Sequence, residues 1–314
     1  MSLSVILNVL VHCIFLVTGL IGNIFILTVH FLDWLTTSEH NPCNLILNGI
    51  GISNIFLQGT VVFQEITFFI YPDFYFKDWV IYMVLAMVTT FSFSSLWCST
   101  CLCFYYCVKI VNLQGTFFYK IKANLSNLVP WLLAFSIVLS WSAGLPAYWD
   151  LYLLMTITTL NITGNITTVT STKYWSRCNC LFHMYICIAS AAFIIISVTG
   201  GTIIISLCKH MSRMRQNNEG FGHARINTHL SAAKTVTLLL VIYLLFYGSF
   251  TLIYNPLGFP DDVTMTICLI ILSCFPSINS IILISGNRKL TNFVKKLFGI
   301  QPSVGNTEVN VTNY

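Results

Sequence analysis

The sequence has very little charge. Asp, Glu, Lys and Arg make up 8% of its 314 residues, whereas hydrophobic residues make up 56%. Soluble domains carry about 25% charged residues, so this chain lacks the polar groups needed to cover a globular surface in water. The composition therefore argues against a soluble protein and indicates a membrane protein.

Seven long stretches contain no charged residue at all: 1–32, 40–64, 79–108, 123–149, 178–208, 235–260 and 263–287. Each can supply the ~20 apolar residues that a helix needs to cross hydrocarbon. Backbone groups in lipid must bond internally, and the alternation typical of barrel strands is absent. We therefore predict an all-α membrane protein, a seven-transmembrane helix bundle with helices near 5–29, 44–70, 80–108, 128–149, 181–207, 235–254 and 263–286.

Lys and Arg are unevenly distributed between the segments that link these helices. Twelve of the 15 fall on the side of the second and third interior loops and the tail, and only Lys77, Lys173 and Arg177 fall on the other. Because these residues concentrate in cytoplasmic loops, we expect an extracellular N-terminus and a cytoplasmic C-terminus. The sequons at Asn161 and Asn165 agree, since both lie in the predicted exterior loop after the fourth helix and are predicted glycosylation sites.

Motifs of common enzymes and carriers are missing. The chain has no Gly-rich phosphate loop, no nucleophile elbow and no HExxH, and its last apolar stretch has no Lys for a Schiff base. Its two halves show no repeat of the kind found in many transporters. We therefore expect no enzymatic activity, no cofactor and no nucleic-acid partner, and a channel or transporter is the less favoured alternative.

The cysteine residues indicate no metal site and leave one possible disulfide open. Most of the 12 Cys residues lie in apolar runs, where they pack as small apolar groups, and no His/Cys spacing suggests a metal site. Cys178 and Cys180 lie near the predicted outer end of the fifth helix, and Cys268 lies near that of the seventh. A disulfide between Cys268 and either residue is one reading, which the sequence leaves open.

Six short motifs follow one another along the chain. They are GLIGNIFIL at 19–27, LNGIGISN at 47–54, FYYCVKI at 104–110, SLCKHMSRM at 206–214, HLSAAK at 229–234 and PSINSIILISGNRKL at 276–290. Together they resemble the marks of the type 2 (bitter) taste receptor family over nearly the whole chain. The fourth and fifth motifs favour this family over the type 1 vomeronasal receptors, which are the alternative.

The chain departs from the family's pattern at three places. It has Ser53-Asn54 where the family has Ser-Arg, Asn279-Ser280 where the family has His-Ser, and Ala192-Phe193 where the family has Pro-Phe. A fish or amphibian member would fit these departures. Asn54 stands where the family has a charged Arg in the second helix. An amide-to-amide hydrogen bond between Asn23 and Asn54 is one replacement for the link that this Arg would make.

The resemblance implies a G-protein-coupled receptor in the plasma membrane. In this family a small exogenous (bitter) molecule binds among the outer halves of the helices and shifts the balance between two packings. The inner ends then admit the α subunit of a heterotrimeric G protein, which we expect to be gustducin-like. The inner-rim residues implied by the motifs, with Arg213 added by position, are Lys109, His210, Arg213, His229 and Lys234. Snorkelling to lipid headgroups explains Lys109 and Lys234 equally well.

The predicted ligand-binding residues lie on four helices. Glu65 is an acid within an apolar helix, where it is costly unless it faces the bundle interior, water or a partner. The resemblance implies the other pocket positions, each of which has core packing as its other reading: Leu85, Val88, Thr89, Ser92, Phe93, Phe246, Ser249, Leu269 and Leu272. Such a pocket suits drug-sized apolar ligands, some of them cationic.

Three amides lie within the predicted helices one, two and seven. Because buried amides in lipid must bond to neighbouring helices, Asn23, Asn54 and Asn279 are interpreted as a shared polar switch. Three unrelated helix contacts are the alternative.

The segment after the seventh helix, 287–299, places apolar residues on one helical face and basic residues beside it: Leu290, Phe293, Val294 and Leu297. This pattern predicts a short amphipathic helix on the lipids of the inner leaflet. The receptor bundle is thus predicted to span 1–300, and a disordered cytoplasmic tail is predicted at 301–314.

Overall fold

The computed structural model describes eight segments of the chain: 3–37, 41–111, 116–146, 151–162, 165–176, 180–216, 223–253 and 262–299. Within them, seven helices are long and apolar enough to cross a membrane. They are α1 (Leu3–Thr37), α2 (Pro42–Ile70), α4 (Asp78–Ile110), α6 (Leu125–Gly144), α8 (Cys180–Gln216), α9 (His223–Ile253) and α10 (Asp262–Gly286). The predicted seven-helix bundle is confirmed. The predicted tail at 301–314 lies outside the described residues.

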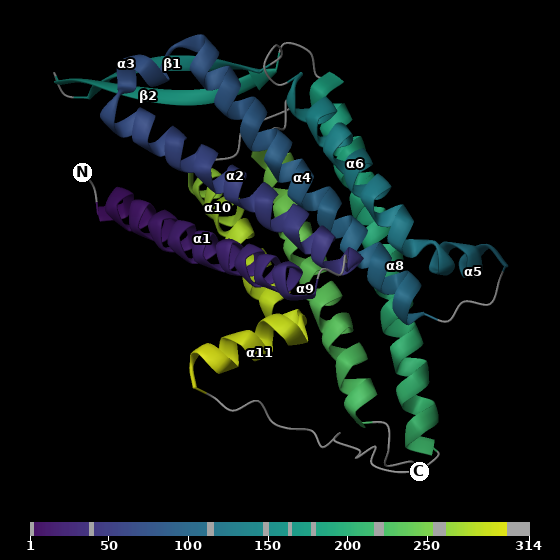
Figure 1. Ribbon diagram of the computed structural model, residues 1–314. Helices are drawn as coiled ribbons and strands as arrows, with labels where there is room; N and C mark the ends of the chain where they lie inside the picture. The colour runs from purple at the N-terminus through teal and green to yellow at the C-terminus, as the bar shows by residue number, and fades with distance from the viewer. Residues whose placement is uncertain are drawn as a thin grey trace, which may run out of the picture.

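Three shorter helices and one pair of strands complete the described structure. They are α3 (Pro72–Tyr75), α5 (Thr116–Ala123), α11 (Arg288–Leu297), β1 (Leu151–Ile162) and β2 (Asn165–Ser176). β1 and β2 pair in antiparallel register from Leu151 opposite Ser176 to Ile162 opposite Asn165. Figure 1 shows the strands and α3 at one end of the bundle, which is the predicted outer end, whereas α5 and α11 lie away from it. The sequence analysis did not anticipate this ribbon.

Two helix ends differ from the predicted ones for identifiable reasons. The fourth helix was predicted to reach residue 149, but α6 ends at Gly144, because Pro146 has no backbone N–H to continue the ladder. The first was predicted to end near residue 29, but α1 continues to Thr37 and includes Asp33. That carboxylate is tolerated there because it forms an ion pair with Lys289 and accepts a hydrogen bond from Asn44.

The start of α2 is set by its first residues. The Asn41 side chain accepts a hydrogen bond from the Cys43 backbone N–H at 3.0 Å, which satisfies one of the free donors of the first turn. Pro42 follows at the first helical position, where its missing N–H costs nothing. The helix therefore begins where the sequence changes from loop to apolar run.

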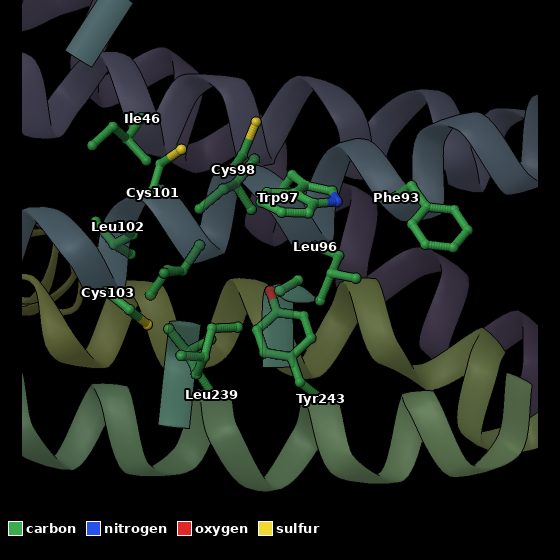
Figure 2. Close-up of a cluster of buried hydrophobic side chains, with 14 of the residues drawn as sticks. Ile46, Phe93, Leu96, Trp97, Cys98, Cys101, Leu102, Cys103, Leu239 and Tyr243 are labelled. Atoms are coloured by element: carbon green, nitrogen blue, oxygen red, sulfur yellow. The ribbon is translucent and has the colours of Figure 1, made fainter. Parts of the chain in front are cut away.

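α4 lies at the centre of the bundle. It contacts α2, α6, α8 and α9, whereas α1 packs against α2 and α10, and α9 packs between α8 and α10. A helix that is apolar all round is typically buried, and most of α4 is buried from Val80 to Val108. Figure 2 shows part of the resulting core, where Tyr243 of α9 points toward Leu96 of α4.

Small residues let helices approach closely in this bundle, as they do in other membrane proteins. A Cβ added to Gly144 of α6 would lie 1.7 Å from the Thr90 hydroxyl oxygen and 2.8 Å from the Ala86 carbonyl oxygen, both on α4. A Cβ added to Gly22 of α1 would lie 2.4 Å from the Ser280 hydroxyl oxygen of α10. These contacts fix the distances of α6 and α1 from their neighbours.

Candidate ligand-binding cavity and polar core

An aromatic cavity lies between α4, α8 and α9, near the midpoint of α4. Its lining has no charged side chain and consists of Phe93, Leu96, Ala189, Phe193, Tyr243, Phe246, Tyr247 and Phe250. The cavity volume is about 10 Å³, close to the space that one water requires. Pockets for drug-sized ligands hold ~300–1,000 Å³, so this packing of the helices has the lining of a ligand site but no room for a ligand.

The rings around this cavity form a continuous cluster. The Phe93 ring lies 5.7 Å from that of Phe250, and both rings lie 5.8 Å from that of Tyr185, between ring centroids. Phe246 lies 6.0 Å from Phe250 and 4.6 Å from Phe275 of α10. Pairs at these separations attract through offset and edge-to-face contacts, so movement of one ring is felt by its neighbours.

Two of the residues predicted to bind ligand, Phe93 and Phe246, line the cavity together. Of the other predicted residues on α4, Leu85, Thr89 and Ser92 are buried. The Thr89 hydroxyl donates to the Leu85 carbonyl oxygen at 2.7 Å. Val88 is half-buried on the same helix.

The structure does not bring the remaining predicted residues into the cavity lining. Glu65 is half-buried in α2, and Leu272 is half-buried against the core. Leu269 is 42% exposed on α10, which fits a lipid-facing residue better than a pocket residue. Ser249 is buried in α9 beside Phe250 but is not part of the lining.

Sequence reasoning missed most of the cavity. Four lining residues of α9, Tyr243, Phe246, Tyr247 and Phe250, recur at the spacing of one helical face, and only Phe246 was selected. That aromatic spacing is a signal that could have found the other three. The contributions of α8, Ala189 and Phe193, depend on how that helix is rotated, which the sequence does not specify.

A hydrogen-bonded polar core lies within the bundle. Asn23, Asn54 and Asn279 are all fully buried. Asn54 Nδ2 donates to Asn23 Oδ1 at 3.1 Å, and the Ser95 hydroxyl donates to Asn54 Oδ1 at 2.7 Å. Asn279 Nδ2 donates to Ser95 Oγ at 3.4 Å. The three predicted amides therefore belong to one network, and Ser95 of α4 is the member that the sequence analysis missed.

The amide of α1 also reaches α10. Asn23 Nδ2 donates to the Gly19 carbonyl oxygen at 2.8 Å and lies 3.4 Å from the Pro276 carbonyl oxygen. Pro276 is inside α10 and removes one N–H from its ladder. The network thus joins four helices, α1, α2, α4 and α10, and the amide-to-amide bond considered for Asn23 and Asn54 is present.

The predicted coupling residues lie toward the opposite end of the bundle from the strands. His210 and Arg213 lie in α8 beyond the apolar part that ends at Ser206, and His229 lies in α9 before the apolar part that starts at Lys234. Figure 1 shows these parts of α8 and α9 projecting beyond the other helices.

Two predicted Lys residues are described with their side chains. Lys109 and Lys234 are both exposed. Lys109 Nζ donates to the Tyr105 hydroxyl at 3.1 Å and lies 5.3 Å from the centroid of that ring.

The amphipathic helix predicted at 287–299 is observed as α11, from Arg288 to Leu297. Asn287 caps it by accepting from the backbone N–H of Lys289 at 2.9 Å. Leu290 is buried and the Phe293 ring lies 5.8 Å from that of Phe25 in α1, whereas Leu297 is exposed. The apolar face of α11 is therefore shared between the bundle and its surroundings.

Two other features of the described residues are an open hollow and a buried cysteine. An open hollow of about 300 Å³ lies between α1 and α2, and none of the predicted ligand residues belongs to its lining of Leu27, His30, Phe31, Trp34, Asn48 and Ile52. Cys268 is a buried free cysteine, so the disulfide considered for it is not formed, and Cys178 lies outside the described residues.

Comparison with known proteins places this architecture in a family. The family model described as "Taste receptor protein (TAS2R)" matches residues 1–301. Taste receptor type 2 member 40 of chicken (Gallus gallus) is 26% identical over 289 residues, which cover 90% of each chain. Human taste receptor type 2 member 39 is 27% identical over 288 residues, covering 89% of this chain and 82% of the relative. Gorilla taste receptor type 2 member 7 is 28% identical over 282 residues, covering 87% and 86%. The chain therefore belongs to the taste receptor type 2 family, multi-pass G-protein-coupled receptors of the plasma membrane.

Proposed function

We propose that this protein is a bitter taste receptor that binds small exogenous molecules between α4, α8 and α9 and activates a heterotrimeric G protein with a gustducin-like α subunit. The observation that carries the proposal is the aromatic cavity, because Phe93 and Phe246 line it together as the family resemblance implied. Its lining favours apolar and aromatic ligands. The type 1 vomeronasal alternative has no such support, since the family match names the taste receptors.

Polar groups near the cavity supply anchors for part of a ligand. The hydroxyls of Thr89, Ser92 and Ser249 are buried close in sequence to the lining residues Phe93 and Phe250. Such hydroxyls give orientation within an otherwise apolar site. The carboxylate of Glu65 on α2, toward the predicted outer end, is the group that would favour cationic ligands.

Ligand entry requires the cavity to expand from about 10 Å³. An agonist thus binds a packing in which the rings of α8 and α9 have moved apart, and its binding raises the population of that packing. Because α8 and α9 continue beyond the apolar bundle, a change in their separation at the cavity changes the separation of their inner extensions. This is how ligand binding opens the site for the G protein.

The inner extensions of α8 and α9, with the end of α4, form the proposed G-protein site. It carries Lys109, His210, Arg213, His229 and Lys234. The polar core of Asn23, Asn54 and Asn279 is the proposed switch between cavity and inner site, since its bonds join four helices. α11 is proposed to lie on the lipids of the inner leaflet with Lys295 and Lys296 at the headgroups.

The receptor assay is expression with a promiscuous or gustducin-like Gα, followed by calcium release against a panel of bitter compounds. We expect at least one compound to raise calcium in a dose-dependent manner. Phe246→Ala should weaken that response, whereas Phe135→Ala should not, because Phe135 is 58% exposed on the outside of α6. A silent receptor with normal surface level and a ligand-independent current would instead support the channel alternative.

Coupling is tested by His210→Ala and His229→Ala. Each should change basal or agonist-driven signalling while surface level stays normal. Unchanged signalling in both single variants and in the double variant would show that the two residues lie at the membrane edge without a role in coupling.

A further inference from the structure

One wall of the aromatic cavity reaches the outside of the bundle. Six of the eight lining residues are buried, whereas Phe193 of α8 and Tyr247 of α9 are half-buried. The lining residues Phe93 and Leu96 belong to the central helix α4. The two half-buried rings, from helices that pack against each other, therefore separate the cavity from the surroundings of α8 and α9.

Two contacts between α8 and α9 hold this wall in place. The Tyr247 ring stacks on that of Phe193, with centroids 6.4 Å apart and planes inclined by 11°. The Tyr247 hydroxyl and Ser190 Oγ share a hydrogen bond of 3.0 Å. Ser190 is half-buried and does not line the cavity, so this bond lies beyond the aromatic wall. The gap between α8 and α9 is closed there.

This gap lies at the depth of the hydrocarbon. The apolar part of α8 starts at His183, seven residues before Ser190, and that of α9 ends at Ile253, six residues after Tyr247. At 1.5 Å per residue, the bond is about 10 Å inside the predicted outer ends of both helices. Leu244 of α9, which is 47% exposed, marks the lipid-facing surface beside it. An uncharged apolar molecule in the outer leaflet can reach the gap, whereas a charged one is strongly disfavoured there.

We infer that the Ser190–Tyr247 hydrogen bond is a gate, through which uncharged apolar ligands enter the cavity from the outer leaflet. The gate is closed in the unliganded packing, and entry breaks the bond because α8 and α9 must separate at this point. The same separation is the one proposed to reach the inner extensions of these helices, so the closed gate also restrains activation. The inference rests on the proposed function, since it takes the aromatic cavity to be the ligand site. It adds a route, a ligand class and two residues that the family resemblance did not select.

Ser190→Ala and Tyr247→Phe test the gate, because each removes one hydroxyl and the second keeps the ring. Each should slightly lower the melting temperature of the unliganded receptor and raise basal signalling, since a bond of the closed packing is lost. The half-maximal concentration of the most potent uncharged agonist in the bitter panel should fall about 3-fold, the average effect of one interhelical hydrogen bond. The double variant should match either single variant, because both remove the same bond.

Thr202→Val is the matched control for the gate. It also removes a hydroxyl from α8, but Thr202 Oγ1 donates to the Val198 carbonyl oxygen of its own helix at 2.7 Å. Its loss does not free α8 from α9. Basal signalling and the half-maximal agonist concentration should therefore stay at the wild-type values.

The route is tested by Leu244→Trp and Leu245→Trp. These neighbouring residues are 47% and 52% exposed. Leu244 lies three residues before Tyr247 and shares its helical face, whereas Leu245 lies two residues before it and points elsewhere. Leu244→Trp should obstruct the gap and slow both binding and release of the radiolabelled agonist in membranes. Its half-maximal concentration should change little, because the cavity lining is unaltered, and Leu245→Trp should keep the wild-type rates.

The outcomes separate the inference from the proposed function. In a wild-type receptor that responds, an unchanged half-maximal concentration in both gate variants overturns the inference alone. A raised concentration also overturns it, since the two hydroxyls would then anchor the agonist. Equal rates in the two Trp variants overturn the route through the lipid and the inference with it. A wild-type receptor that reaches the surface and answers no compound contradicts the proposed function, and the inference is rejected with it.

Discussion

Asp33 near the inner end of α1 forms an ion pair with Lys289 in the first turn of α11. The same carboxylate accepts a hydrogen bond from Asn44 Nδ2 of α2 at 3.2 Å. One acid thus holds the starts of α2 and α11 to the end of α1. It also explains why α1 can extend two turns past the last residue predicted from the apolar pattern.

Asp33→Asn should destabilise this corner only modestly. Lys289 is 50% exposed and Asp33 is 15% exposed, and pairs of this kind contribute about 0.2–1 kcal/mol. We expect a small decrease in melting temperature that becomes smaller at high salt, measured with a dye that reacts with cysteines uncovered on unfolding. Lys296→Ala, in the last turn of α11, is the control and should leave the melting temperature unchanged. An equal decrease in both variants would assign no stability to the ion pair.

The bond between Asn23 and Asn54 should appear as an interaction energy. A double-mutant cycle measures it from the free energies of unfolding of four receptors: the wild type, Asn23→Ala, Asn54→Ala and the double variant. Interhelical hydrogen bonds in membranes average about 0.6 kcal/mol and reach about 1.7 kcal/mol, and we expect a value in this range. Additive effects of the two substitutions would show that the 3.1 Å contact contributes nothing specific.

The predictable parts of this protein are those fixed by local composition. The seven helices follow from charge-free stretches, and α11 follows from the spacing of Leu290 and Phe293 beside basic residues. The end of α6 was missed because one residue, Pro146, overrides an apolar run that continues past it. The end of α1 was missed because Asp33 is stabilised by a partner more than 250 positions away in the sequence.

In the candidate site, too, residues with a local sequence signal were predictable, whereas features that depend on packing between helices were not. Asn23, Asn54 and Asn279 could be selected because an amide in lipid needs a partner, but Ser95, which bridges them, looks like any other serine of α4. Leu269 was selected by alignment of motifs, yet the rotation of α10 leaves it exposed. Helix rotation is decided by packing between helices, which a single sequence does not contain.

Gly144→Ala should be strongly destabilising for so small a change. The added Cβ would meet the Thr90 hydroxyl and the Ala86 carbonyl oxygen, and the latter is backbone that cannot rotate away. Overpacking of this kind costs about 1–3 kcal/mol, so melting temperature and surface level should fall. Gly248→Ala is the control, because a Cβ there has no described atom within 4 Å. It should be neutral or slightly stabilising, and equal effects of the two would contradict the close approach of α6 to α4.

Glycosylation should occur on the strand pair. In the register, Asn161 lies opposite Ile166 and Asn165 lies opposite Ile162, so both sequons are at the same end of the ribbon. A glycosidase should shift the electrophoretic band, and Asn161→Gln combined with Asn165→Gln should abolish the shift. Asn124, between α5 and α6, begins a third sequon, Asn-Leu-Ser, on the predicted cytoplasmic side. A glycan that remains there would place that segment outside the cell and reverse the predicted orientation.

Glu65→Gln should distinguish ligand recognition from a structural role. The change keeps the size and hydrogen bonding of the half-buried side chain but removes its charge. If the carboxylate contacts the cationic part of an agonist, cationic agonists should lose about 1.5–3 kcal/mol, or about 10- to 150-fold in potency. Neutral agonists, held by the aromatic rings, should change much less. The measurement is a set of dose–response curves for both ligand classes at matched surface level.

The pattern of losses decides between the two roles of Glu65. A structural Glu65 would lower surface level and weaken all agonists together, because the outer end of α2 packs beside α3, where Gln64 Nε2 donates to the Tyr75 hydroxyl at 3.4 Å. Gln64→Ala removes that contact and is the matched control, since it alters the same turn without altering charge. Equal losses for cationic and neutral agonists in Glu65→Gln at normal surface level would remove Glu65 from the ligand site. The aromatic cavity would then bind its ligands without a charged anchor, because its lining contains none.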